Sequence, residues 1–143
     1  MTPHQPIRCT HARHAQAILD IFNEAIETST ALYDYQPRSM AQMATWFETK
    51  QQHGWPVIGM EDEAGTLLGV ASYGSFRNWP AYKYSVEHSV YVRADCRGAG
   101  LGAILLLALV ERAKAAGKHA MVAAIEAGNE ASLRLHARCG FEP

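Results

Sequence analysis

The residues best suited to chemistry lie in a glycine-rich segment between an apolar strand pattern and a long apolar helix pattern. Residues 97–102 read Arg-Gly-Ala-Gly-Leu-Gly, and they follow the alternating stretch 84–92. Glycines at such a turn permit positive φ angles and let a ligand approach the backbone closely. The N–H groups that begin the next helix, helped by its dipole, suit a phosphate. The sequence therefore predicts a phosphate-binding turn, with a glycine-rich turn that binds nothing as the alternative.

One cofactor class that fits this turn is a dinucleotide. Residues 98–103 match the G-x-G-x-x-A pattern, and Glu126 follows the next strand pattern, as a ribose-binding acid does. However, residues 93–97 separate the strand pattern from the first glycine, and the later β-α units that a dinucleotide needs are missing. A Walker A loop is excluded because the turn lacks Gly-Lys-Ser/Thr. A dinucleotide-dependent oxidoreductase is therefore the weaker interpretation.

The other cofactor class is an acyl-CoA, because several motifs resemble those of the GCN5-related N-acetyltransferase (GNAT) superfamily. Residues 97–102 match its R-x-x-G-x-G/A signature. Residues 129–141 resemble its N-x-x-A/S-x-x-L-Y-x-x-x-G-F helix, with His136 at the usual tyrosine position. Within the superfamily, segments 22–26, 86–92 and 123–129 resemble the phosphinothricin and methionine sulfoximine acetyltransferase branch. The resemblance spans almost the whole chain from Ile7.

This resemblance implies acetyl-CoA as co-substrate and assigns residues to it. The implied cofactor contacts are Val90, Tyr91, Val92, Arg97, Gly98, Ala99, Gly100, Leu101, Gly102, Ala103, Asn129 and Ser132. The residues implied around the acceptor are Ser75, Phe76, Arg77, Glu87, His88, Ser89 and Glu126. Similar enzymes of this branch often have Trp in place of Phe76 and an acidic residue in place of Ser75. These departures leave the exact acceptor open.

Two carboxylates are candidates for the proton transfer that an amine acceptor needs. An amine is mostly protonated at neutral pH and must lose a proton before it attacks a thioester. Glu87 shares its strand face with Ser85, Ser89 and Tyr91, which predicts a polar cleft and makes Glu87 the candidate base. Glu126 is a second candidate base or a ligand for the substrate ammonium. A solvated carboxylate is the alternative for each of them.

Each of the further candidate side chains has a catalytic or binding interpretation and a purely structural one. His136 is a candidate to protonate the departing CoA thiolate, or else a packing histidine. Arg77 is a candidate clamp for an acceptor carboxylate, or else a solvated loop arginine. Cys96 lacks a histidine or aspartate at a diagnostic spacing, so an acyl-enzyme intermediate is disfavoured. His11 and His14 have no third ligand nearby in the sequence, so no metal site is predicted.

Composition narrows the class of protein. The 143 residues include 13 basic and 14 acidic side chains, and this balance gives no electrostatic case for nucleic acid or an anionic membrane. The longest apolar run, residues 103–110, is far shorter than the ~20 residues of a membrane span. Residues 1–10 lack the apolar region of a secretory signal, and three scattered cysteines support neither disulfides nor a zinc cluster. We expect a cytoplasmic protein with a small-molecule substrate.

Hydrophobic periodicity predicts the elements that position these residues. Strand patterns cover residues 7–10, 57–60, 66–73, 84–92 and 120–125, with a hairpin turn at 62–65. One helix carries an apolar face of Ala15, Ile18, Leu19, Phe22, Ala25 and Ile26. A second helix follows a Ser39–Gln42 capping box and ends near residue 54. Helices are also predicted over 101–116, ending at Gly117, and from Asn129 to Cys139.

The resulting order, β-α-α-β-β-β-α-β-α, predicts an α/β (α+β) fold whose mixed central sheet is flanked by helices. The resemblance implies that residues 1–143 form a single GNAT domain. It also implies one or two more sheet-completing strands after Pro143, so a C-terminally truncated domain is expected. Similar enzymes imply a homodimer.

We therefore expect an acetyl-CoA-dependent N-acetyltransferase that acts by direct transfer in a ternary complex. The acceptor implied by the resemblance is the α-amine of a small amino acid or analogue, such as phosphinothricin, methionine sulfoximine or methionine sulfone. A non-catalytic acyl-CoA-binding or sensor module is the alternative from another class.

Overall fold

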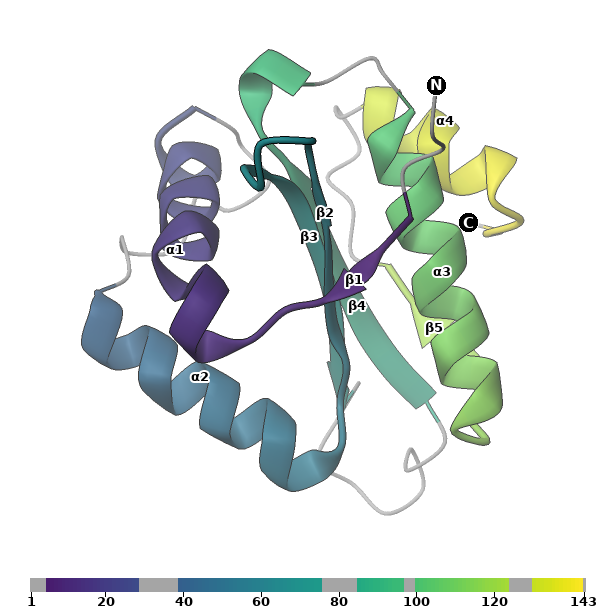
Figure 1. Ribbon diagram of the computed structural model, residues 1–143. Helices are drawn as coiled ribbons and strands as arrows, with labels where there is room; N and C mark the ends of the chain where they lie inside the picture. Colours follow the sequence, from purple (N-terminus) through teal and green to yellow (C-terminus); the bar gives the residue numbers. More distant parts are fainter. Residues whose placement is uncertain (1–4, 29–38, 76–84, 97–99, 124–129, 143) are drawn as a thin grey trace.

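Five strands form one mixed sheet in a computed structural model that describes residues 5–28, 39–75, 85–96, 100–123 and 130–142 (Figure 1). The strands are β1 Ile7–Arg8, β2 Val57–Glu61, β3 Leu67–Ser75, β4 Ser85–Val92 and β5 Ala120–Val122. They lie side by side in chain order. The pairs from β1 to β4 are antiparallel, whereas β5 runs parallel to β4. The predicted order and mixed sheet are confirmed.

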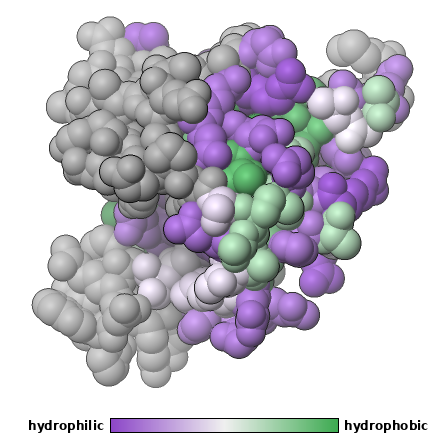
Figure 2. All heavy atoms as spheres, turned by 90° about the vertical axis from the view of Figure 1, so that its left-hand side faces the viewer, coloured by the Kyte–Doolittle hydropathy of each residue, from purple (hydrophilic) through white to green (hydrophobic). Residues whose placement is uncertain are grey.

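Helices cover both faces of this sheet. The α1 helix, His11–Thr28, and the α2 helix, Met40–His53, lie on one face (Figure 1). The α3 helix, Leu101–Ala115, lies on the other face, with α4, Glu130–Arg138, beside it. The outward surface on the α1 and α2 side is mainly hydrophilic where it is described, with a small hydrophobic area at its centre (Figure 2). On the opposite side of the sheet, α3 leaves Ile104 and Leu107 exposed.

Side-chain alternation along the strands divides the core between the two faces. One buried cluster joins Ile18, Phe22 and Met43 of the first two helices to Val57 and Val70 of the sheet. The other cluster joins Leu101, Leu105, Leu109 and Ala113 of α3 to Ile58, Met60, Ala71, Tyr73 and Val86. Because successive strand residues point to opposite faces, neighbours such as Val70 and Ala71 serve different clusters. The sheet is thus buried on both sides.

Local hydrogen bonds explain where several elements begin and end. Ser39 and Gln42 form the predicted capping box, and Gly54, with a φ of 70°, ends α2. Asp62 Oδ1 accepts from the N–H groups of Ala64 and Thr66 in the turn between β2 and β3. These three features confirm the sequence prediction.

Four strands differ from their predicted bounds: β2 ends at residue 61 instead of 60, β3 covers Leu67–Ser75 instead of 66–73, and β1 and β5 are shorter than predicted. The first was expected over residues 7–10, but β1 ends at Arg8 because Thr10 already belongs to the start of α1. The N–H group of Thr10 donates to Nδ1 of His14 at 3.0 Å, and Thr10 Oγ1 accepts from the N–H group of Arg13. The last strand was expected over 120–125, and the described part of β5 is Ala120–Val122. Residues 124–125, and Asn129 as the predicted cap of α4, lie outside the described residues.

Candidate active site

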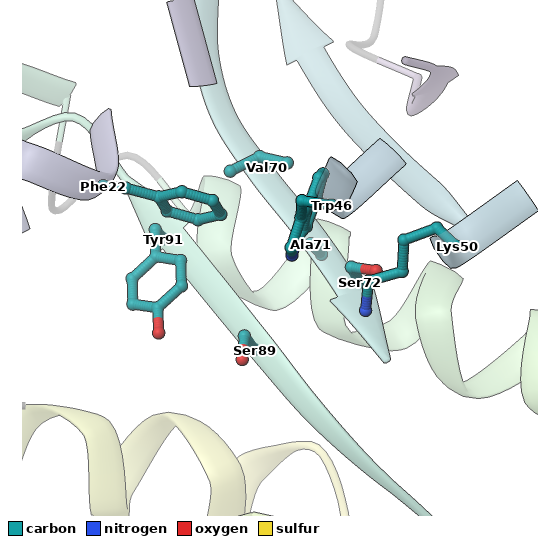
Figure 3. Close-up of a pocket in the computed structure, with 8 residues that line it drawn as sticks. All are labelled: Phe22, Trp46, Lys50, Val70, Ala71, Ser72, Ser89 and Tyr91. Carbon is teal, nitrogen blue, oxygen red and sulfur yellow. The ribbon is translucent and has the colours of Figure 1, made fainter. Parts of the chain in front are cut away.

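A hollow between α1, α2 and the sheet gathers aromatic, cationic and hydroxyl side chains. Figure 3 shows these side chains, which come from both helices, from β3 and from β4. The lining residues are Phe22, Trp46, Lys50, Val70, Ala71, Ser72, Ser89 and Tyr91. We call this set the helix–sheet pocket. Apolar walls with a few polar groups are typical of small-molecule sites.

Three aromatic rings fix the wall of the helix–sheet pocket. The Phe22 ring packs edge to face against Trp46, with centroids 5.6 Å apart, and against Tyr91, with centroids 5.2 Å apart. Such edge-to-face pairs stabilise the packing by about 0.5–1.5 kcal/mol beyond the area they bury. The pocket wall therefore has a fixed shape that joins α1, α2 and β4.

The cation of the pocket, Lys50, is held in place by the sheet and by two indole rings. Its Nζ donates to the carbonyl oxygen of Tyr73 at 2.8 Å. The same Nζ lies 5.3 Å from the Trp46 ring centroid and 5.5 Å from that of Trp55, within the range of cation–π attraction.

Glu87 lies on the same sheet face as Lys50. In β4 it is directly opposite Gly74 of β3, and alternation puts its side chain on the side of Ser89 and Tyr91. A Cβ atom on Gly74 would lie 3.6 Å from Lys50 Nζ. Since paired Cβ atoms are about 5 Å apart, Lys50 Nζ lies within roughly 9 Å of the Glu87 Cβ. A half-buried carboxylate and a held ammonium thus share one face of the sheet.

Strand pairing limits where β4 contacts its neighbour β5. The described parallel ladder joins Ser85, Val86 and Glu87 to Ala120, Met121 and Val122. Val90, Tyr91 and Val92 lie beyond this ladder and pair with Ala71, Val70 and Gly69 on their other side. The stretch that the family resemblance assigns to the cofactor therefore lies past the last described β4–β5 pair.

The start of α3 has the backbone geometry that the glycine motif predicted. Gly100 caps the helix with a φ of 79°, a left-handed conformation that glycine adopts without strain. Leu101, Gly102 and Ala103 form the first turn, whose N–H groups have no partner within a helix. Together with the helix dipole, these groups fit a pyrophosphate. Arg97, Gly98 and Ala99 lie outside the described residues.

Gly102 has a second, structural reason to be glycine. A Cβ atom there would lie 3.2 Å from Cδ2 of Leu135 in α4. The missing side chain therefore lets α4 pack close to the start of α3. Ser132, another predicted cofactor contact, lies in the first part of α4 and is half-buried.

The structure divides the predicted acceptor set between the two faces of the sheet. Ser89 lines the helix–sheet pocket, whereas the neighbouring His88 is 8% exposed and faces the α4 side. His88 Nε2 lies 2.9 Å from His136 Nε2, so two predicted site residues from distant parts of the chain meet there. Ser75 is exposed at the end of β3. Phe76, Arg77, Glu126 and Asn129 lie outside the described residues.

The remaining candidate side chains are engaged locally. Burial and the neighbouring Asp95, which accepts from the thiol at 3.3 Å, raise the pKa of Cys96, which disfavours a nucleophilic thiolate. His14 Nε2 lies 3.4 Å from Glu61, while the His11 ring packs on Phe47. In the described part of the chain, no group of three or more His, Cys, Asp or Glu side chains is arranged to hold a metal ion. No described helix is long and apolar enough to cross a membrane.

Sequence reasoning missed part of the helix–sheet pocket. Phe22, Trp46, Lys50 and Ser72 were not among the predicted site residues. The available signal was the spacing of Trp46 and Lys50, which are four residues apart and so share one face of α2. That face contacts the sheet through Lys50, and only the packing of α2 on β3 reveals it.

Comparisons with known proteins agree with this geometry. The model described as acetyltransferase (GNAT) family matches residues 16–141. An L-methionine sulfoximine/L-methionine sulfone acetyltransferase of Pseudomonas aeruginosa is 51% identical over 125 residues, which cover 87% of this chain and 73% of that protein. An L-amino acid N-acyltransferase of Escherichia coli is 40% identical over 135 residues, covering 94% of this chain and 78% of that protein.

A solved structure extends the comparison to the whole described fold. The GNAT superfamily phosphinothricin acetyltransferase of Sinorhizobium meliloti, in complex with AcCoA, superposes with a TM-score of 0.93 at 35% identity. The match covers 99% of this chain and 76% of that one. The sheet order, the helix that follows the glycine turn and the placement of α1 and α2 are therefore shared with a structure that holds the cofactor.

Proposed function

Because the chain belongs to the acetyltransferase (GNAT) family, we propose that it transfers the acetyl group of acetyl-CoA to the α-amine of a small amino acid or analogue. Methionine sulfoximine, methionine sulfone and phosphinothricin are the acceptors we propose, since relatives named for them are among the similar proteins. The observation that carries the acceptor class is the pair of opposite charges on one sheet face, Glu87 and Lys50. Binding a zwitterionic amino acid requires a cation for its carboxylate and an anion for its ammonium.

Each charge has a separate role in the proposed site. Lys50 attracts the acceptor carboxylate, and the rings of Phe22, Trp46 and Tyr91 enclose its side chain. Glu87 receives the proton of the acceptor ammonium, directly or through a water, so that the neutral amine can attack. The amine nitrogen then bonds to the thioester carbon, the C–S bond breaks and its electron pair remains on sulfur, while the second N–H proton of the amine leaves to water as the amide forms. Glu126 and Arg77 stay predicted acceptor ligands.

The cofactor contacts are proposed on the geometry of β4 and α3. The backbone of Val90, Tyr91 and Val92 binds the pantetheine arm as an added strand would, past the last described β4–β5 pair. The first-turn N–H groups of α3 hold the pyrophosphate, with Gly100 making the turn. Arg97, Gly98, Ala99, Asn129 and Ser132 stay predicted contacts. Holding the thioester beside Glu87 places both reactants for direct transfer without an acyl-enzyme.

The test of this function is release of thiol from acetyl-CoA with a panel of amino-acid acceptors. Turnover is expected with at least one of the three proposed analogues. Glu87→Gln is expected to lower kcat by about 10²–10⁴, the usual contribution of a positioned base, while acetyl-CoA still raises the melting temperature as in the wild type. Glu111→Gln, on the surface of α3, is the matched control. Unchanged turnover in Glu87→Gln would remove this residue from the base role.

The alternative of a non-catalytic acyl-CoA-binding module makes a different prediction. It predicts stabilisation by acetyl-CoA without thiol release across the whole amine panel. The expected homodimer rests on the resemblance to similar enzymes, the expected cytoplasmic location rests on the composition of the sequence, and both stay predictions. Light scattering of the purified protein tests the first of them.

A further inference from the structure

Two buried histidines meet between β4 and α4, outside the helix–sheet pocket. His88 is 8% exposed and His136 is 7% exposed, and their Nε2 atoms are 2.9 Å apart. The Phe141 ring lies against both imidazoles, with centroid distances of 5.3 and 5.2 Å. The two rings are thus held in a direct nitrogen–nitrogen contact that is shielded from water.

The other nitrogen of each ring faces a backbone carbonyl oxygen. His88 Nδ1 lies 3.1 Å from the oxygen of Val122 in β5, and His136 Nδ1 lies 2.7 Å from the oxygen of Ser132 in α4. His136 Nδ1 also lies 3.4 Å from the Ser132 hydroxyl oxygen, but the carbonyl oxygen is the nearer partner. Because a carbonyl oxygen only accepts hydrogen bonds, the geometry favours a proton on each Nδ1. Turning either ring by 180° would replace its nitrogens with carbons at both contacts and lose two hydrogen bonds.

These contacts fix the number of protons on the pair. If both rings were neutral with protonated Nδ1 atoms, two lone pairs would face each other at 2.9 Å. A proton between the Nε2 atoms converts that repulsion into a charge-assisted hydrogen bond. We propose that His88 and His136 share one proton between their Nε2 atoms and form a buried pair with a single positive charge. We call this the histidine pair.

The surroundings favour one proton over two. His136 lies in the last turn of α4, where the helix dipole stabilises a cation. Burial and the charge of His136 lower the pKa of His88, so a second proton is disfavoured. Two ionisable side chains among the described residues pack near the pair: Tyr73, opposite His88 on β3, and Cys139, at the end of α4. Burial raises the pKa of both, so both stay uncharged at neutral pH.

Arg112 and Glu87 are charged side chains that lie farther from the histidine pair. Arg112 of α3 acts on Tyr73, and Glu87 points to the other sheet face. The described residues of β5, Ala120, Met121 and Val122, have no ionisable side chain. In the part of the chain that the structure describes, the charge on the pair is therefore balanced by carbonyl dipoles rather than by a carboxylate.

The catalytic consequence rests on the proposed function. His136 follows Ser132, a predicted CoA contact, by one turn of α4, so the pair lies beside the proposed path of the CoA arm. Both ring nitrogens of His136 are engaged, which argues against direct proton donation from this ring. When the C–S bond breaks, the pair instead stabilises the thiolate by its positive charge and keeps its proton. His88 is then a positioning residue that acts through His136.

The protonation state can be measured without any activity. Long-range ¹H–¹⁵N spectra of the ¹⁵N-labelled wild-type protein at pH 7 distinguish protonated from unprotonated imidazole nitrogens. Both Nδ1 atoms of the pair are expected to resonate as protonated, and both Nε2 atoms at a position between the two classes. His53, an exposed histidine on α2, serves as the reference signal from outside the pair. A Nδ1 signal of the unprotonated class in either ring at pH 7 would overturn the proposal.

A variant then tests the effect on the reaction. In His88→Gln the side-chain amide offers a permanent N–H donor to His136 Nε2, so the pair no longer needs the shared proton. We expect kcat/KM at pH 7 to fall about tenfold, less than the 10²–10³ lost with a direct oxyanion donor, with acetyl-CoA affinity unchanged. His14→Gln removes another buried histidine and controls for lost stability.

The pH profile separates charge from structure. The wild type and His14→Gln are expected to lose activity at high pH as the shared proton dissociates, and His88→Gln is expected to lack this decline. The same high-pH decline in His88→Gln would refute the role of the charge. Absence of turnover in the wild type with every acceptor would refute the proposed function, while the NMR result would still decide the proton count.

Discussion

Replacing Lys50 by methionine tests whether its ammonium binds the acceptor carboxylate. Methionine matches the unbranched apolar stem of lysine as far as Cε and lacks the ammonium group. In the wild type, Lys50 Nζ is already held by the Tyr73 carbonyl oxygen at 2.8 Å and by the Trp46 and Trp55 rings. Little side-chain entropy is therefore lost when the ammonium binds an anion, which increases the net effect of its charge.

The magnitude follows from the position of Lys50. A hydrogen bond to a charged group contributes about 1.5–3 kcal/mol, and Lys50 is half-buried, which limits screening by solvent. This range corresponds to a loss of roughly 10- to 150-fold in kcat/KM for the acceptor. The KM for acetyl-CoA is expected to stay unchanged, because the proposed cofactor contacts lie on β4, α3 and α4.

The assay compares each acceptor with its carboxamide, which keeps the amine and lacks the negative charge. Thiol release is measured for wild type, Lys50→Met and the control Lys114→Met, whose lysine lies on the surface of α3 near Glu111. The wild type and the control should prefer the carboxylate form, and Lys50→Met should accept both forms equally. If Lys50→Met keeps the wild-type preference for the carboxylate, Lys50 does not bind that group.

Two further predictions concern stability. Gly59→Ala is expected to lower the free energy of unfolding by about 1–3 kcal/mol and to leave the kinetic constants unchanged. The reason is that its Cβ would lie 2.7 Å from Cys9 Sγ and 3.0 Å from the Gly69 carbonyl oxygen. Urea titration of the variant measures this change, and a decrease below about 0.5 kcal/mol would contradict the prediction. The lowered pKa of His88 means that below about pH 6.5 the unfolded chain binds more protons than the folded one. The free energy of unfolding, measured by urea titration, is therefore expected to fall as the pH is lowered from about 6.5 to 5, by at most ~1.4 kcal/mol per unit from this group. A free energy of unfolding that rises as the pH is lowered over this range would contradict the prediction.

The sequence by itself determined the elements and the cofactor-binding turn. Alternation over residues 84–92 and the helical periodicity before and after it are local properties, so the strand and helices they predict formed with small changes in their bounds. The left-handed φ of Gly100 is likewise a local consequence of a glycine before a helix. Motifs that resemble the GNAT superfamily are contiguous in the chain, which made the family visible without a structure.

The tertiary structure decided which distant side chains meet. Strand alternation could tell that Glu87 and His88 point to opposite faces, but only the packing of α4 brought His136 within 2.9 Å of His88. In the same way, Lys50 entered the pocket because α2 crosses the end of β3, where the Tyr73 carbonyl accepts from it. These two contacts join residues that are separated by 23 and by 48 positions in the sequence. They depend on how the helices pack on the sheet, and a local sequence pattern does not determine that packing.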